Sequence, residues 1–376
     1  MPFKPDAPRT VIVLQGGGAL GAYQGGVCET LAAHGYPPDW LVGTSIGAIN
    51  SAILAGNPPE RRMERLRAFW QRVGREDTLA GWSNHPLAAW LQPWMAAGGL
   101  WDTMIRGVPG FFEPRQGAAL NINQDVPPAQ ASFYDTSPLQ RTLEELVDFD
   151  YLNAGHVRCT VCAVDVATAE MTVFDSARQR LTAQHIMASG ALPPGFPPVV
   201  IDGRAYWDGG IYSNTPVDIV MDDAERQDTL CFMVDLWDPT EATPRSISAA
   251  MARQKDIQFA SRTREHLDDH RKMQDMRRAI DILSRHLPEA ARDDPALARL
   301  SRLGCRSTVN IVRLIMKALP TDDHSKDIDF GRSRLDARWQ AGTRDALRML
   351  NNKRWLRPLP PGVGMMVHEM EQEDRP

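Results

Sequence analysis

Ser45 stands in the middle of a short pattern that can make a serine reactive. Residues 43–47 read Gly-Thr-Ser-Ile-Gly, which fits the G-x-S-x-G pattern of a serine on a sharp turn between a strand and a helix. The two glycines let the backbone bend tightly because they carry no Cβ. On such a turn the Ser45 hydroxyl would project outward as a nucleophile.

The residues around this turn predict the strand and the helix that it needs. Residues 40–42 (Trp-Leu-Val) are short and apolar, which is typical of a buried strand. Residues 48–55 favour a helix, and the Gly-Asn-Pro-Pro run at 56–59 stops it. Because G-x-S-x-G occurs by chance in many chains, this context gives the motif its weight.

A glycine-rich loop at 16–21 follows the first predicted strand, residues 10–15. The loop also satisfies G-x-G-x-x-G, but a dinucleotide site needs an acidic residue at the end of the second strand, and here Asp39 precedes that strand. The alternative use is an oxyanion hole, in which exposed amides donate to the charge that develops on a carbonyl oxygen. We therefore disfavour a nucleotide cofactor.

A serine hydroxyl is a weak nucleophile and needs a base. The nine histidines show no motif that would make one of them this base; they are His34, His85, His156, His185, His266, His270, His286, His324 and His368. A buried aspartate can serve instead, because burial raises its basicity. Asp208 opens an Asp-Gly-Gly run after the proline-rich stretch 191–199. Taken alone, that run is also typical of a turn with a capping aspartate.

Length and composition indicate a globular protein with two or three structural units: 376 residues, 43% hydrophobic and 24% charged. The sequence has no run of about 18 apolar residues, so we expect no membrane span. The first residues lack the apolar core of a secretory signal. We therefore expect a cytoplasmic protein. The five scattered cysteines fit a reducing compartment, and the pair Cys159 and Cys162 is interpreted as core packing because no second pair completes a zinc set.

The C-terminal part is basic. Residues 245–357 hold 25 Arg and Lys against 15 Asp and Glu, a net charge of +10, which leaves -15 for the rest of the chain. The pattern of this part predicts helices, and Leu314, Ile315 and Leu319 would belong to a buried helix face. We expect the tail after Pro358 to be mobile. The basic residues either contact anionic lipid or form a solvated face of Arg–Asp pairs. Nucleic-acid binding is not expected, because no aromatic interleaving or known module accompanies them.

The remaining pattern predicts helices at 22–33, 61–72, 137–146 and 181–188, and strands at 157–166, 171–174 and, as the last core strand, 230–236. Strands that alternate with helices predict a parallel α/β fold. We assign residues 1–240 to an α/β hydrolase domain with a cap insertion at 75–135, and residues 241–376 to an Arg-rich helical region. The insertion contains a Trp-rich segment at 81–112, which is either a packed subdomain or an apolar cap over the site.

Three blocks taken together resemble the patatin-like phospholipases and acyl hydrolases. They are the glycine loop at 16–21, the elbow at 43–47, and the Asp-Gly-Gly at 208–210 preceded by the Phe-Pro-Pro at 196–198. Their order and spacing match over residues 10–236, and the C-terminal region looks like an addition of one bacterial subgroup. The resemblance implies a three-layer core around a parallel sheet.

The resemblance also implies a Ser-Asp dyad that works without a cofactor. Ser45 would attack an ester carbonyl, Asp208 would take its proton and return it to the leaving alcohol, and amides of Gly16, Gly17 and Gly18 would hold the oxyanion. Lipid esters are the expected substrates: phospholipids, lysophospholipids or acylglycerols, at a membrane or a lipid inclusion.

Two alternatives stay open. Short-chain or hydroxyalkanoate esters and oligomers are alternative substrates, because Leu20 stands where many phospholipase members carry Arg or Lys. The other alternative is a non-catalytic lipid-binding protein of the same fold. The presence together of Ser45, Asp208 and the glycine loop argues against it.

Overall fold

The structure is a computed structural model and describes residues 8–76, 106–118, 122–240, 243–260, 263–320 and 322–369. Its centre is a nine-stranded sheet in the spatial order β11-β10-β9-β1-β2-β5-β8-β7, with β6 paired to β5. The strands are β1 (Arg9–Leu14), β2 (Trp40–Gly43), β5 (Arg158–Asp165), β6 (Met171–Asp175), β7 (Val199–Ile201), β8 (Arg204–Asp208), β9 (Thr229–Asp235), β10 (Val309–Ile315) and β11 (Met365–Glu369). A separate two-stranded sheet joins β3 (Glu113–Pro114) and β4 (Tyr134–Asp135).

The strands from β11 to β5 are parallel, and β6, β7 and β8 run antiparallel to their neighbours. Strand β1 lies inside this sheet and is apolar on both faces. Val11 and Val13 belong to one core cluster, whereas Ile12 and Leu14 belong to the other. Side chains alternate along a strand, so a sheet covered on both faces needs a continuous apolar run such as this one.

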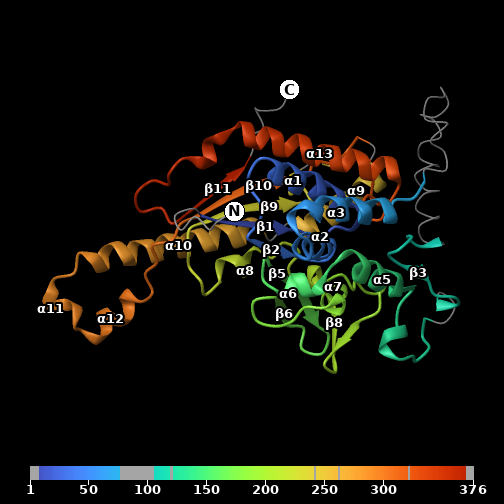
Figure 1. The fold of residues 1–376 in the computed structure, drawn as a ribbon, viewed down its shortest axis with the longest axis horizontal. Coiled ribbons are helices and arrows are strands. Elements are labelled where there is room, and N and C mark those ends of the chain that lie inside the picture. Colours follow the sequence, from blue (N-terminus) through green and yellow to red (C-terminus); the bar gives the residue numbers. More distant parts are fainter. Residues whose placement is uncertain are drawn as a thin grey trace.

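Helices cover both faces and give three layers, as Figure 1 shows. One face carries α1 (Ala22–Ala33), α2 (Ile46–Ala55), α3 (Pro59–Val73) and α13 (Arg332–Asn351), continued toward β5 by α5 (Ser137–Leu146), α6 (Phe149–Asn153) and α7 (Ala183–Ser189). The other face carries α8 (Val217–Met221) and α10 (Thr263–Arg285), whose Val217 and Leu267 pack on Val11 and Val13. The predicted three-layer α/β fold is confirmed.

The expectation of a helical C-terminal part was wrong at two places. Residues 309–315 form β10, so Leu314 and Ile315 lie in a strand, and β11 stands in the tail that was expected to be mobile. The strand at 309–315 was missed because the charged side chain of Arg313 interrupts its apolar run in the sequence. In the fold it is buried because it forms ion pairs with Asp235 and Glu369. The division of the chain at residue 240 stays a prediction, and the pairing of β9 with β10 joins the two proposed parts in one sheet.

The last helix, α13, packs directly on α1 through glycines. A Cβ added at Gly26 would lie 2.0 Å from the Trp339 carbonyl oxygen, and one at Gly342 would lie 2.1 Å from the Tyr23 carbonyl oxygen. Since a Cβ essentially never approaches a backbone oxygen so closely, only glycine permits this helix separation. The C-terminal part is therefore packed into the core.

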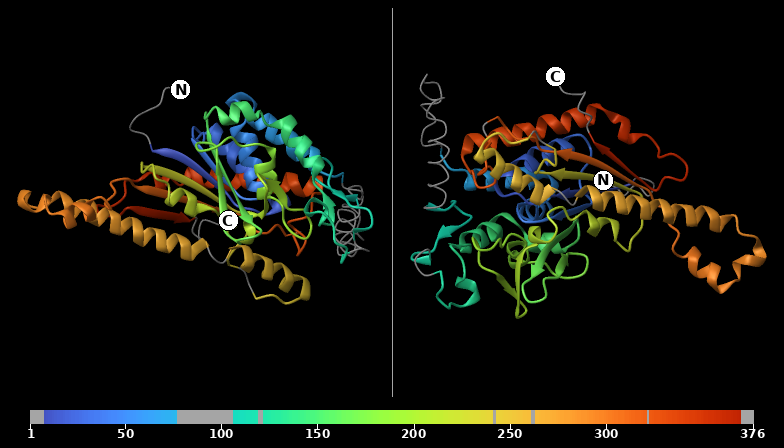
Figure 2. Two further views of the ribbon diagram at one scale, coloured as in Figure 1. Left: turned by 90° about the horizontal axis from the view of Figure 1, so that it is seen from below. Right: turned by 180° about the vertical axis from the view of Figure 1, so that it is seen from behind.

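The far half of α10 leaves the sheet and forms, with α11 (Glu289–Arg292) and α12 (Pro295–Ser301), an arm that projects from the body (Figures 1 and 2). Apolar side chains are exposed on it, including Met276 and Leu283. Several of its arginines pair with acidic residues; Arg285 and Arg306, for example, both contact Asp281.

Residues 77–105, which include much of the Trp-rich segment at 81–112, lie outside the described residues, as do residues 119–121 of the predicted insertion. Phe111 and Phe112 are described, and both are buried against Phe196. These two aromatic side chains therefore pack in the core. Among the described residues, no helix combines the length and the apolar character that a membrane span would require.

Candidate active site

Ser45 occupies a strained turn between β2 and α2. Its φ of 55° and ψ of -122° lie in a backbone region that non-glycine residues rarely adopt. Both glycines of the pattern are enforced by close packing: a Cβ at Gly43 would lie 2.3 Å from the Gly47 carbonyl oxygen, and one at Gly47 would lie 2.1 Å from the Leu14 carbonyl oxygen. The strand, turn and helix expected around Ser45 are present.

Asp208 lies at the end of β8, and its side chain meets Ser45. The Ser45 side chain lies close enough to the Asp208 carboxylate to lower the pKa of that group. The Gly210 amide donates to Asp208 Oδ1 at 2.7 Å. Asp208 is 3% exposed, whereas Ser45 is partly exposed, so the serine is open to a substrate while the aspartate is shielded from water.

The environment of Asp208 makes it a stronger base than an ordinary carboxylate. Burial raises its pKa to about 6, although the hydrogen bond from the Gly210 amide and the nearby Ser45 side chain act in the opposite direction. At neutral pH the group is still ionised and can accept a proton. A base with a pKa near the working pH is the most effective kind.

The glycine loop borders the serine. A Cβ added at Gly16 would lie 3.1 Å from Ser45 Cβ. The Gly16 amide already donates to the Asn214 carbonyl at 3.2 Å, which argues against the expected role of Gly16 as an oxyanion donor. The amides of Gly17 and Gly18 have no acceptor among the described residues, and both residues are partly exposed. The geometry leaves these two amides available to a substrate.

Two residues that sequence reasoning missed hold the site together. The Ser45 amide donates to both the carbonyl and the hydroxyl oxygen of the buried Ser189, each at 3.1 Å. Asn214 Nδ2 donates to the Gly16 carbonyl at 3.0 Å, so Asn214 bonds to Gly16 in both directions. The only signal for Asn214 is its position six residues after Asp208. Nothing in the sequence marks Ser189.

Gln15, just before the glycine loop, fastens that loop to the end of β9. Its Oε1 accepts hydrogen bonds from the amides of Leu236 and Trp237, and its Nε2 donates to Thr215 Oγ1 at 2.7 Å. Gln15 is fully buried, so these bonds satisfy a polar side chain that would otherwise destabilise the core.

No histidine among the described residues hydrogen-bonds to Ser45 or Asp208. His266 and His270 instead bond to Asp218, where α10 meets α8. Cys159 and Cys162 are free and buried, and burial raises the pKa of each thiol to about 12, so both stay protonated. The interpretation of this pair as core packing is confirmed.

Three exposed apolar side chains are neighbours in the chain of residues that bond to Asp208. Leu192 is 43% exposed and follows Ala191, whose carbonyl accepts the Asp208 amide. Ile211 and Tyr212 are 48% and 52% exposed and directly follow Gly210.

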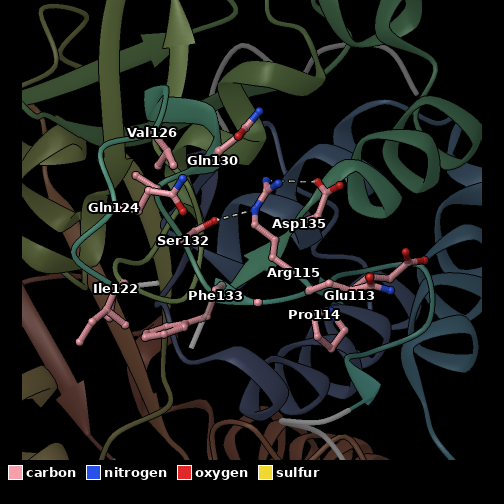
Figure 3. A pocket seen from close by; sticks show the side chains of 15 residues that line it. Glu113, Pro114, Arg115, Ile122, Gln124, Val126, Gln130, Ser132, Phe133 and Asp135 are labelled. Atoms are coloured by element: carbon pink, nitrogen blue, oxygen red, sulfur yellow. Dashed lines mark hydrogen bonds and ion pairs between the residues drawn. The ribbon is translucent and has the colours of Figure 1, made fainter. Parts of the chain in front are cut away.

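A separate cavity of about 770 Å³ lies between β3, β4 and Pro194. Figure 3 shows Arg115 inside it, bonded to Ser132 and facing Asp135. One wall is tied to the proline-rich turn, since the Phe133 amide donates to the Pro194 carbonyl at 3.1 Å. Neither Ser45 nor Asp208 lines this cavity.

A serine on a strained strand-to-helix turn, with a buried base and free backbone amides beside it, has the parts that serine hydrolases of α/β fold use. The comparison with known families agrees. The family model described as patatin-like phospholipase matches residues 12–221, more than half of the chain, and a second one, described as patatin phospholipase, matches residues 257–362. The chain belongs to the patatin-like phospholipase family, and the resemblance seen in the sequence is confirmed.

Individual relatives are distant. A patatin-like phospholipase domain-containing protein of Caenorhabditis elegans, ZK370.4, is 24% identical over 56% of this chain and 12% of its own length. Another, from Chaetomium globosum, is 31% identical over 31% of this chain and 14% of its own length. The chain thus spans only a small part of each relative.

Two solved structures are similar in part. VipD from Legionella pneumophila has 13% identity and a TM-score of 0.38 over 92% of this chain and 67% of that one. The ExoU–SpcU complex from Pseudomonas aeruginosa has 16% identity and a TM-score of 0.29 over 78% and 58%. These scores are too low to carry an argument.

Proposed function

We propose that the protein is a serine acyl hydrolase that cleaves carboxylic esters of lipids through an acyl-enzyme on Ser45. The observation that carries this proposal is the proximity of the partly exposed Ser45 side chain, on its strained turn, to the buried Asp208 carboxylate. Family membership supports the same reaction class.

In the first half of the reaction, Asp208 accepts the Ser45 proton while Ser45 Oγ bonds to the ester carbonyl carbon. The carbonyl oxygen becomes an oxyanion, to which the Gly17 and Gly18 amides donate. Collapse of this intermediate breaks the bond to the alcohol, and Asp208 returns the proton to the leaving oxygen. In the second half, Asp208 takes a proton from water, the resulting nucleophile attacks the acyl carbon, and Ser45 regains its proton as the acid leaves.

The surroundings of the dyad support an apolar ester. Leu192, Ile211 and Tyr212 are exposed, and they adjoin in the chain residues that bond to Asp208. Leu20 is fully buried in the core, so the loop offers no cation for a phosphate at that position. Phospholipids, lysophospholipids and acylglycerols remain the proposed substrates, with short-chain or hydroxyalkanoate esters as the alternative.

We also propose that the protein works in the cytoplasm and contacts anionic lipid surfaces through its basic C-terminal part. The net charge of +10 over residues 245–357 supports the contact, and the five free cysteines fit a reducing compartment. Cosedimentation with phosphatidylglycerol vesicles should exceed that with phosphatidylcholine vesicles and should fall as salt rises. Equal binding to both vesicles at every salt concentration would contradict the surface contact.

The activity is tested with nitrophenyl esters from short to long chain, a hydroxybutyrate oligomer and vesicles of phospholipid and lysophospholipid, comparing wild type with Ser45→Ala. We expect turnover that disappears in the variant, with a chain-length profile that separates lipid esters from short esters. If both folded proteins are inactive on every substrate but bind the vesicles, the lipid-binding alternative replaces the hydrolase.

A further inference from the structure

The C-terminal part contacts the glycine loop at Ala19, directly after Gly17 and Gly18, whose amides are unpaired in the described part of the chain. The Ala19 amide donates to the Asp327 carbonyl at 2.8 Å. A Cβ added at Gly18 would lie 2.2 Å from the same carbonyl oxygen, and Gly18 has a φ of +55°. The loop is therefore pressed against residue 327, which lies more than 300 residues later in the chain.

Two lysines hold the segment that carries this carbonyl. Lys255 Nζ bonds to both carboxylate oxygens of Asp327, at 2.7 and 3.0 Å. Lys326 Nζ bonds to Asp256 Oδ1 at 2.6 Å, and the two side chains are 7% and 2% exposed. Lys255 and Asp256 lie on α9 (Ile247–Ala260), so this helix holds residues 326 and 327 in place. We call Lys255, Asp256, Lys326 and Asp327 the C-terminal clamp.

The clamp also reaches the other end of the loop. Lys326 Nζ lies 5.2 Å from the centre of the Trp237 ring, which packs on Phe259 of α9. Trp237 Nε1 donates to the Gly16 carbonyl at 2.8 Å. A Cβ at Gly17 would lie 3.3 Å from that same nitrogen. The loop is thus held at Gly16 and at Ala19, and the Gly17 and Gly18 amides lie between the two fixed points.

From these contacts we infer that the C-terminal clamp positions the Gly17 and Gly18 amides for oxyanion stabilisation, which makes the C-terminal part a component of the active site. The inference rests on the proposed function. A buried ion pair contributes little net stability compared with apolar residues of the same size, so its use here is geometric. Oxyanion donors act only when they are preorganised around the developing charge, so a displaced loop lowers kcat while it leaves substrate binding in place.

The test compares Asp256→Asn and Lys326→Met with Lys326→Arg, which keeps the charge, and with Asp223→Asn. Asp223 is a buried carboxylate that pairs with Arg9 and Arg158 at the amino-terminal ends of β1 and β5, so its variant controls for loss of a buried ion pair. The first readout is hydrogen exchange of a peptide spanning residues 15–22, which is independent of activity. The second is steady-state hydrolysis together with the affinity of an alkyl trifluoromethyl ketone, an analogue of the tetrahedral intermediate.

We expect the two clamp variants to exchange faster in this peptide and to lose at least tenfold in kcat and in ketone affinity, with KM changed less than threefold. Lys326→Arg should recover part of the loss, and Asp223→Asn should lose none. Folded clamp variants with unchanged exchange, or with unchanged kcat and ketone affinity, would overturn the inference. A wild type that shows no Ser45-dependent hydrolysis would defeat the proposed function instead, and the exchange readout would still decide whether the clamp holds the loop.

Discussion

Ser45, two residues after β2, lies close to Asp208, the last residue of β8, although these two strands are not neighbours in the sheet. Strand β5 lies between them: Gly43 of β2 pairs with Val161, and Asp208 of β8 pairs with Ala163. Strand β2 runs parallel to β5 and β8 runs antiparallel to it, so the last residues of β2 and β8 pair with β5 only two residues apart. The proposed dyad therefore spans β5, and the next four predictions concern the groups around it.

The pH profile of kcat/KM should report the ionisation of Asp208. The base must be unprotonated, and burial raises its pKa to about 6. We expect activity to fall tenfold per pH unit below about 6 and to level off above it. The measurement is the initial rate on a nitrophenyl ester between pH 4.5 and 8.5. A plateau that extends unchanged down to pH 5 would remove Asp208 from the role of base.

Asp208→Asn should abolish activity and yet stabilise the fold at neutral pH. The folded pKa lies above the usual value of 3.8, so the folded state holds the proton more tightly than the unfolded chain. The corresponding stability is complete below pH 4 and is lost as pH rises through 6. The loss is on the order of 3 kcal/mol, since one pKa unit corresponds to 1.36 kcal/mol. Thermal unfolding should show a higher Tm for the variant at pH 7.5 and little difference at pH 4; a lower Tm at pH 7.5 contradicts this account.

Gly18→Ala should damage the site more than its backbone strain alone explains. Alanine at a positive φ costs about 1–2 kcal/mol, and here its Cβ would also collide with the Asp327 carbonyl. Gly35→Ala is the matched control, because Gly35 has a φ of +87° with no atom within 4 Å of the added Cβ. We expect a similar small drop in Tm from strain in both variants, and an additional drop with at least a tenfold loss of kcat in Gly18→Ala. Equal behaviour of the two variants would show that the contact with Asp327 is unimportant.

Ser189→Ala should lower kcat several-fold, because the Ser45 amide loses one of its two acceptors and the strained turn is less firmly held. Ser51→Ala provides the comparison: its hydroxyl is buried in α2 without a hydrogen-bond partner among the described residues, so its removal should leave both kcat and Tm nearly unchanged. The measurement is kcat for both variants at saturating ester. A Ser189→Ala enzyme as active as wild type would show that the carbonyl of Ser189 is sufficient.

The sequence was informative where local pattern and chemistry coincide. The glycines at 43 and 47 predicted the turn at Ser45, because a tight turn needs them. The apolar runs at 10–15 and 230–236 predicted buried strands. Strand β10 could not be recognised in this way, since Arg313 breaks its apolar pattern and its partners Asp235 and Glu369 are distant in sequence. Tertiary pairing overrode the local pattern.

The same limit applies to the site. The positions of Ser45 and Asp208 relative to one another came from a resemblance, because spacing in the sequence does not reveal that both flank β5. The engagement of the Gly16 amide by Asn214, and the contact of Asp327 with the loop, depend on the folded chain alone. Such contacts between distant segments leave no periodic or compositional signal.

The most direct test of the central claim is the rate at which a fluorophosphonate modifies Ser45 in the wild type and in Asp208→Asn, followed by intact mass and peptide mapping between pH 4.5 and 8.5. We predict a single adduct on Ser45, formed at a rate that rises with pH to a plateau above about 6, and at least a hundredfold slower in Asp208→Asn. Modification at another residue, or the same rate and pH dependence in the variant, would contradict a Ser45–Asp208 dyad.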